Sequence, residues 1–64
     1  ASMPRDARRV YEASDFEPRG IDRITAECGL TASEVSSILT ALEMQGVVRA
    51  VGGGSYVRTG KIPA

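Results

Sequence analysis

Three cations near the C-terminal end are the residues of this sequence best suited to binding an anion. Arg49, Arg58 and Lys61 are the charged residues of positions 47–64, a segment without an acid. Each can neutralise one phosphate of a nucleic-acid backbone. Three such contacts predict a weak affinity without sequence preference, roughly 10⁻⁴ M or poorer in physiological salt, and a log–log salt slope of magnitude about 2 to 3. The same charges also fit the solubilising decoration of an edge strand.

A row of four small polar side chains and one methionine, called here the small polar row, lies before these cations, at a spacing that places it on one face of a helix. Its members are Ser33, Ser36, Ser37, Thr40 and Met44. Hydroxyls can bond phosphates or base edges, but most specific base contacts come from Arg, Lys, Asn or Gln side chains, which the row lacks. Three interpretations stay open: a solvated face, a direct reader of bases, and a protein-contact face formed by Ser37, Thr40 and Met44.

Residue types that catalysis and metal binding need are scarce. The sequence has no histidine and one cysteine, Cys28, so it lacks a histidine general base, an internal disulfide and a Cys/His zinc site. The run Gly52-Gly53-Gly54 lacks the lysine and hydroxyl residue of a phosphate-binding loop. We therefore expect no enzyme activity, no metal and no cofactor. Cys28 is interpreted as a small buried residue, and a lone cysteine suits a cytoplasmic protein.

Length and charge limit the function further. The 64 residues suffice for one small domain close to the margin of stability. Eight basic and eight acidic side chains cancel, which argues against tight DNA binding by the domain alone, because dedicated DNA binders are basic. Positions 24–46 hold acids and no base, so the small polar row lies in a segment that repels phosphate. No apolar run reaches the roughly 20 residues that cross a bilayer, so no membrane contact is expected.

The ends of the chain are expected to be flexible. We place a flexible start at residues 1–5, the domain at residues 6–58 and a flexible tail at residues 59–64. Ala1 and Ser2 stand ahead of Met3 like residues left by cloning, and the chain is expected to be one domain of a longer protein.

The first helix is expected to begin near Pro4, since proline suits the first helical turn. Its apolar stripe consists of Met3, Ala7, Val10, Tyr11 and Ser14, which recur at helical spacing. Residues 15–20 break the helix, because Pro18 disfavours helical backbone at the residue before it. Phe16 is expected to anchor this loop from beneath.

A second, short helix and a tight turn follow the loop. Asp22 is the expected N-cap of a helix from Arg23 to Cys28. Gly29 fits the left-handed residue that ends such a helix. The interval from Cys28 to Thr31 is therefore the predicted turn of a helix-turn-helix.

The start of the third helix carries the strongest local signal of the sequence. Thr31 and Glu34 match a capping box at the start of a helix from Ala32 to about Gln45, with Leu30 and Val35 at the positions of a hydrophobic staple. Gly46 is expected to cap its end.

A hairpin closes the domain. Val47 to Val51 and Ser55 to Arg58 predict two strands, joined by a turn at the three glycines. Tyr56 could stack on a base, but packing against the third helix is favoured. The elements together predict a small α+β domain, a winged helix-turn-helix with three helices and a two-stranded wing. One core is expected from twelve side chains: Val10, Tyr11, Phe16, Ile21, Ile24, Leu30, Val35, Ile38, Leu39, Leu42, Val48 and Tyr56.

Four motifs together carry a family resemblance. They are Ile21-Asp22-Arg23-Ile24, Gly29-Leu30-Thr31, Leu42-Glu43-Met44-Gln45-Gly46 and Gly53-Gly54-Ser55-Tyr56-Val57-Arg58. In this order they resemble the C-terminal winged-helix domain of the DNA-processing protein DprA, also called Smf. The resemblance covers about residues 8–58. It implies a parent protein with a Rossmann-like domain that binds single-stranded DNA. Such a protein takes part in natural transformation, where it protects incoming DNA and helps to load the RecA recombinase.

The leading hypothesis is therefore an accessory winged-helix module that contacts DNA weakly, holds a protein partner, or does both. A RecA-type recombinase would be a partner of the parent protein. Two alternatives stay open: a sequence-specific transcription-regulator head, and a structural domain that forms a homodimer. The sequence favours neither single- nor double-stranded DNA.

Overall fold

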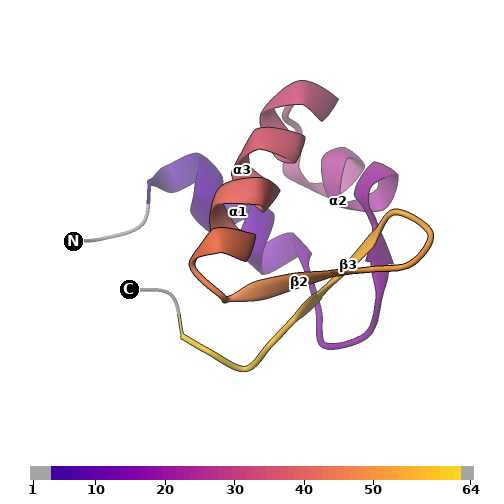
Figure 1. Ribbon diagram of the computed structural model, residues 1–64. Coiled ribbons are helices and arrows are strands. Elements are labelled where there is room, and N and C mark those ends of the chain that lie inside the picture. The colour runs from indigo at the N-terminus through magenta and orange to yellow at the C-terminus, as the bar shows by residue number, and fades with distance from the viewer. Residues whose placement is uncertain (1–3, 63–64) are drawn as a thin grey trace.

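The computed structural model describes residues 4–62, which form three helices and a small antiparallel sheet. In chain order the elements are α1 (Arg5–Ala13), β1 (Arg19–Gly20), α2 (Ile21–Cys28), α3 (Ala32–Met44), β2 (Val48–Val51) and β3 (Ser55–Arg58). Figure 1 shows the three helices gathered on one side of the β2–β3 hairpin. The predicted α+β winged helix-turn-helix is therefore confirmed. None of the described helices is long and apolar enough to cross a membrane.

The turn between α2 and α3 forms as the sequence predicts. Gly29 ends α2 in the left-handed region, with φ +74°, and donates its N–H to the Thr25 carbonyl. Thr31 then caps α3: its hydroxyl accepts the Glu34 N–H at 3.1 Å, and the Glu34 carboxylate accepts the Thr31 N–H at 3.0 Å. Both halves of the capping box are therefore present, and they fix where α3 begins.

Gly46 stops α3 through its own backbone conformation. Its φ is +80°, which allows its N–H to bond the Glu43 carbonyl at 2.9 Å. The N–H of Val47 bonds the Leu42 carbonyl at 3.1 Å, which completes a Schellman motif. The chain therefore turns away from α3 at once and enters β2.

The sheet has one strand more than predicted. The hairpin pairs Val48 with Arg58 through to Val51 with Ser55, around the glycine turn. A two-residue strand, β1, adds to the other edge of β3, so the strand order is β1-β3-β2. The two-stranded wing is thus part of a three-stranded sheet, and β1 joins the wing to the helices.

The predicted start of α2 was wrong. The helix begins at Ile21 rather than Arg23, and its N-cap is Gly20, which makes no side-chain cap bond. Because β1 runs directly into α2, Gly20 is still extended when the helix begins. Asp22 lies in the first turn instead, where its negative charge favours the helix dipole.

The core lies between the helices and the sheet. Its buried members are Val10, Ala13, Ile24, Cys28, Val35, Leu39, Leu42, Val47 and Val48, with Tyr11, Ile21, Leu30, Ile38 and Tyr56 packed against them. Burial of Cys28 and packing of Tyr56 are therefore confirmed. The predicted anchor Phe16 was wrong, because its side chain is 61% exposed. Its loop is fastened instead by the main chain, through a 2.8 Å bond from the Arg58 N–H to the Asp15 carbonyl.

The predicted flexible ends lie partly outside the described residues, which exclude 1–3 and 63–64. Within the described part, Arg5 already belongs to α1. Thr59 donates its hydroxyl to the Gly46 carbonyl at 2.6 Å and its N–H to the Val47 carbonyl at 3.1 Å. The segment that follows β3 is therefore fastened to the end of α3.

Candidate nucleic-acid interface

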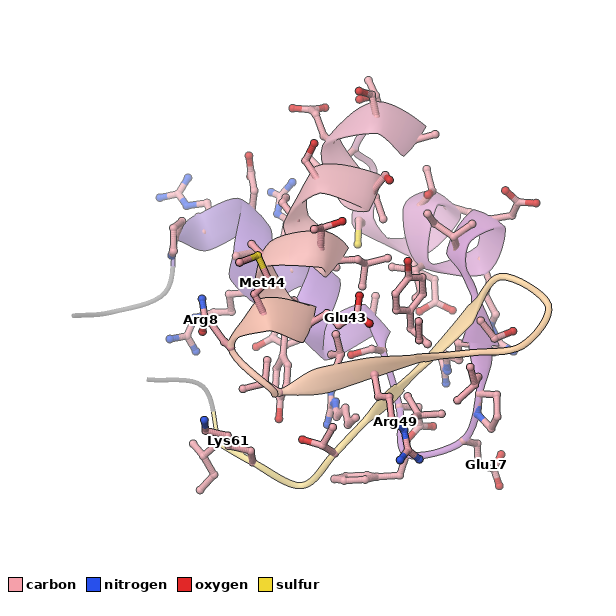
Figure 2. The ribbon with its side chains drawn as sticks, viewed as in Figure 1. Arg8, Glu17, Glu43, Met44, Arg49 and Lys61 are labelled. Carbon is pink, nitrogen blue, oxygen red and sulfur yellow. The ribbon has the colours of Figure 1, made fainter. Side chains whose placement is uncertain are left out.

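Arg49 is the exposed cation of the hairpin. It lies in the middle of β2, and its side chain has no hydrogen bond or ion pair with another residue of the described range 4–62. Figure 2 shows the side chain leaving β2 on the side away from the helices. Its guanidinium is thus available to an anion in solution, and its binding requires no rearrangement of the fold.

Arg58, a second predicted phosphate contact, is occupied by the fold. Its guanidinium donates to the Tyr11 carbonyl at 3.0 and 3.3 Å and to the Glu12 carbonyl at 3.4 Å. It also lies over the Tyr11 ring, 4.4 Å from the centroid. Helix α1 has no basic residue in its last turn, so Arg58 supplies from β3 the cation that a helix C-terminus favours.

Lys61 has the same relation to α3. Its ammonium donates to the Gln45 carbonyl at 3.0 Å, and α3 has no basic residue in its own last turn. The side chain stays exposed, so its charge remains accessible to solvent. Figure 2 shows Arg8, Lys61 and Arg49 pointing in different directions, so these cations do not converge on one patch.

The small polar row of α3 is exposed along its whole length. It consists of Ser33, Ser36, Ser37, Thr40 and Met44, and Met44 is 85% exposed. The Thr40 hydroxyl donates to the Ser36 carbonyl at 3.0 Å, so one donor of the row is used within the helix. The structure therefore places these residues together on a surface without a basic side chain.

Negative charge flanks this row. Glu34 lies in the first turn of α3, and its hydrogen bonds from the Thr31 backbone and hydroxyl hold the pKa of its carboxyl below the usual range. Glu43 is exposed near the other end of the helix (Figure 2). A phosphate backbone that approached α3 would thus meet two carboxylates of a helix that has no basic residue of its own, with Lys61 as the cation at its C-terminal end.

Arginines of the N-terminal half divide into two groups, a division that the sequence pattern did not predict. Arg19 pairs with Glu27 at 3.1 Å and with Asp15 at 3.4 Å, and Arg23 pairs with Glu27 at 3.1 Å. The two Arg19 pairs tie β1 to α2 and to the preceding loop, and the Arg23 pair lies within α2. The remaining three, Arg5, Arg8 and Arg9, are exposed on α1.

The family model described as DprA winged helix domain matches residues 1–54 of the 64. This chain belongs to the DprA winged helix domain family. Comparison with curated proteins and with solved structures found no match.

The family match confirms the resemblance drawn from the motifs. Within this DprA winged helix domain, the matched range includes Arg49 and the small polar row and ends at the glycine turn. Arg58 and Lys61 follow it. The predicted DNA contacts of all these residues stay predictions.

A shallow groove of about 380 Å³ lies between α1 and α3 of this DprA winged helix domain. It is lined by Pro4, Asp6, Ala7, Ser37, Ile38, Ala41, Leu42 and Gln45. Of the predicted partner-contact residues, Ser37 lies on this groove, whereas Thr40 and Met44 do not line it. The groove therefore contains only one of the three predicted partner-contact residues.

Cys28 lies at the base of a second depression, beside Arg9, Ala13 and Glu27. The thiol is 7% exposed and lies 3.5 Å from the Arg9 carbonyl. Burial raises the pKa of the Cys28 thiol, the Glu27 charge raises it further, and the Arg9 charge opposes both. The thiol is therefore poorly ionised at neutral pH, as expected of a structural cysteine.

Proposed function

We propose that this domain is an accessory DNA-contacting module of a DprA-like protein that processes incoming DNA in natural transformation. Its hairpin contacts the phosphate backbone weakly and without sequence preference. The observation that carries the proposal is Arg49, an exposed cation without a protein partner among the described residues, in the wing of a DprA winged helix domain.

The number of available cations sets the expected strength. Arg58 is held by the end of α1, which leaves Arg49 and the exposed Lys61 as contacts from the C-terminal segment. Two phosphate contacts predict a log–log salt slope of about −1.8 on duplex DNA and about −1.4 on a single strand. The expected affinity stays at the non-specific level, roughly 10⁻⁴ M or weaker in physiological salt.

A sequence-specific reader is a poorer fit to this chain. Such a protein inserts α3 into the major groove and reads base edges with long polar side chains. The outer face of α3 offers small hydroxyls and Met44, with Glu34 and Glu43 nearby. These features favour contact through the wing over contact through the helix.

Protein contact through α3 is the second candidate function, favoured by the groove beside Ser37. In the parent protein the occupant would be a partner such as a RecA-type recombinase, or a second copy of this domain. Sedimentation over a concentration series tests the homodimer, with Ser37→Arg as the disrupting variant. A wild-type domain that stays monomeric at every concentration removes self-pairing.

A titration of the isotope-labelled domain with short single- and double-stranded DNA at low salt tests the leading proposal. We expect amide shifts in β2 and β3 around Arg49, with the outer residues of α3 unchanged. An absence of shifts at millimolar DNA removes the DNA contact and leaves the protein-contact role.

A further inference from the structure

The loop between α1 and β1 presents an exposed aromatic ring that the core does not explain. Phe16 is 61% exposed, whereas Tyr11 and Tyr56 are half-buried and packed against the core. The backbone beneath the ring is held in place: the Phe16 N–H bonds the Asp15 carboxylate at 2.7 Å, and the Asp15 carbonyl accepts the Arg58 N–H at 2.8 Å. The ring thus stands in solvent on a fixed support.

An ordered cation lies beside this ring. The Arg58 guanidinium lies 4.4 Å from the Tyr11 centroid and 5.8 Å from the Phe16 centroid. Its hydrogen bonds to the Tyr11 and Glu12 carbonyls hold it over both rings. Tyr11, Arg58 and Phe16 form a pile, called here the aromatic pile, and its Phe16 end is open to solvent.

The exposed hairpin cation Arg49 lies on the sheet that carries Arg58. Arg49 of β2 pairs in register with Val57, the neighbour of Arg58 on β3, so the side chains of Arg49 and Arg58 leave the sheet on opposite faces. Glu17 follows Phe16, and Figure 2 shows its carboxylate on the same side of the sheet as Arg49, away from the helices. An anionic strand is therefore attracted at Arg49 and repelled at Glu17. An exposed ring and an exposed cation on one domain suit a ligand that carries both flat bases and negative charge.

We propose that Phe16 is a stacking platform for an unpaired nucleobase of a single-stranded nucleic acid whose phosphates contact the hairpin at Arg49. Aromatic side chains bind successive bases of single strands in this way, because every base has a π-face. A base inside a duplex already stacks on its neighbours, so the platform favours single strands. The inference rests on the proposed function, since it gives the DNA contact a base-binding residue and a strand preference.

The test uses fluorescence polarisation with a short oligodeoxyadenosine and with a duplex of the same length, at low salt. Phe16→Ala should weaken single-strand binding by roughly 5-fold or more, since base stacking is worth about 1–3 kcal/mol per base. Phe16→Leu should lose a similar amount, because it keeps apolar bulk and lacks the π-face, and Phe16→Trp should retain binding. Duplex binding should stay unchanged in all three. Ile62→Ala is the matched control, because Ile62 is an exposed apolar residue outside the pile.

A second measurement on the wild-type domain guards against variants that unfold. Oligodeoxyadenosine should shift the ring protons of Phe16 upfield through the stacked base, whereas inorganic polyphosphate should not. If Phe16→Leu binds the single strand like the wild type and the ring protons stay in place, the stacking inference is wrong while the DNA contact stands. If the wild-type domain binds neither oligonucleotide, the proposed function fails, and the inference fails with it.

Discussion

Replacing Arg58 and Arg49 by alanine, one at a time, separates the cation that supports the fold from the cation available to DNA. Both exchanges remove one positive charge from the same hairpin, so they are matched in net charge. The structure nevertheless predicts that the two exchanges affect different properties of the domain. Arg58→Ala should destabilise the domain, whereas Arg49→Ala should weaken DNA binding.

The magnitudes follow from the contacts. Hydrogen bonds from a charged group contribute about 1.5–3 kcal/mol, and the partial exposure of Arg58 lowers our expectation to about 1–2 kcal/mol. At about 4–8 °C per kcal/mol for a domain of this size, Arg58→Ala should lower the Tm by about 4–16 °C. Arg49 has no partner to lose, so its exchange should change stability by less than about 0.5 kcal/mol.

Thermal unfolding followed by circular dichroism measures the first effect, and binding to duplex DNA over a salt series measures the second. Arg49→Ala should reduce the magnitude of the log–log salt slope by about 0.9, while Arg58→Ala should leave the slope unchanged below its own Tm. The reasoning is refuted if Arg58→Ala melts like the wild type, or if the slope falls with Arg58→Ala and not with Arg49→Ala.

Three further predictions concern the capping box and the buried thiol. Thr31→Ala should lower the free energy of unfolding by about 1 kcal/mol and Thr31→Ser by much less, as measured by urea denaturation, because serine keeps the capping hydroxyl. The Thr31 bonds lower the folded pKa of Glu34, so the stability that they supply is fully present above the ordinary value of 4.5 and is lost as the pH falls through the lowered pKa. The wild type should therefore lose stability as the pH is lowered from 4.5 through the lowered pKa of Glu34, and Glu34→Gln should flatten this part of the stability–pH curve. Cys28 should react slowly with a thiol reagent at mildly alkaline pH and fast in urea, because burial raises its pKa in the folded state; equal rates in both states would show that the thiol is accessible.

Elements that local backbone chemistry specifies could be predicted from the sequence. Thr31 and Glu34 bond each other's backbone, and Gly46 adopts a positive φ that other residues rarely adopt, so both ends of α3 follow from a few adjacent residues. The hairpin is specified in the same way by its glycine turn. The strand β1 has two residues, too few for an alternating pattern, and it exists only because β3 supplies the partner. Its presence also moved the start of α2 to Ile21.

The roles of the cations depend on tertiary placement and could not be read from spacing. Arg58 and Lys61 were predicted as phosphate contacts beside Arg49, and nothing in their neighbours along the chain separates the three. The fold brings Arg58 to the end of α1 and Lys61 to the end of α3, and neither helix has a basic residue in its own last turn. Exposure of Phe16 has the same origin, since a main-chain bond between its loop and β3 replaces an apolar anchor.

A carboxylate introduced on the wing or on α3 tests most directly the central claim that the hairpin, and not the third helix, contacts DNA. Arg49→Glu and Ser36→Glu each place a carboxylate on an exposed site, one on β2 and one on the outer face of α3. The affinity of both variants for DNA at low salt is the quantity to measure. We expect Arg49→Glu to abolish measurable binding and Ser36→Glu to bind nearly as the wild type does. Loss of binding in Ser36→Glu with binding retained in Arg49→Glu would contradict the claim.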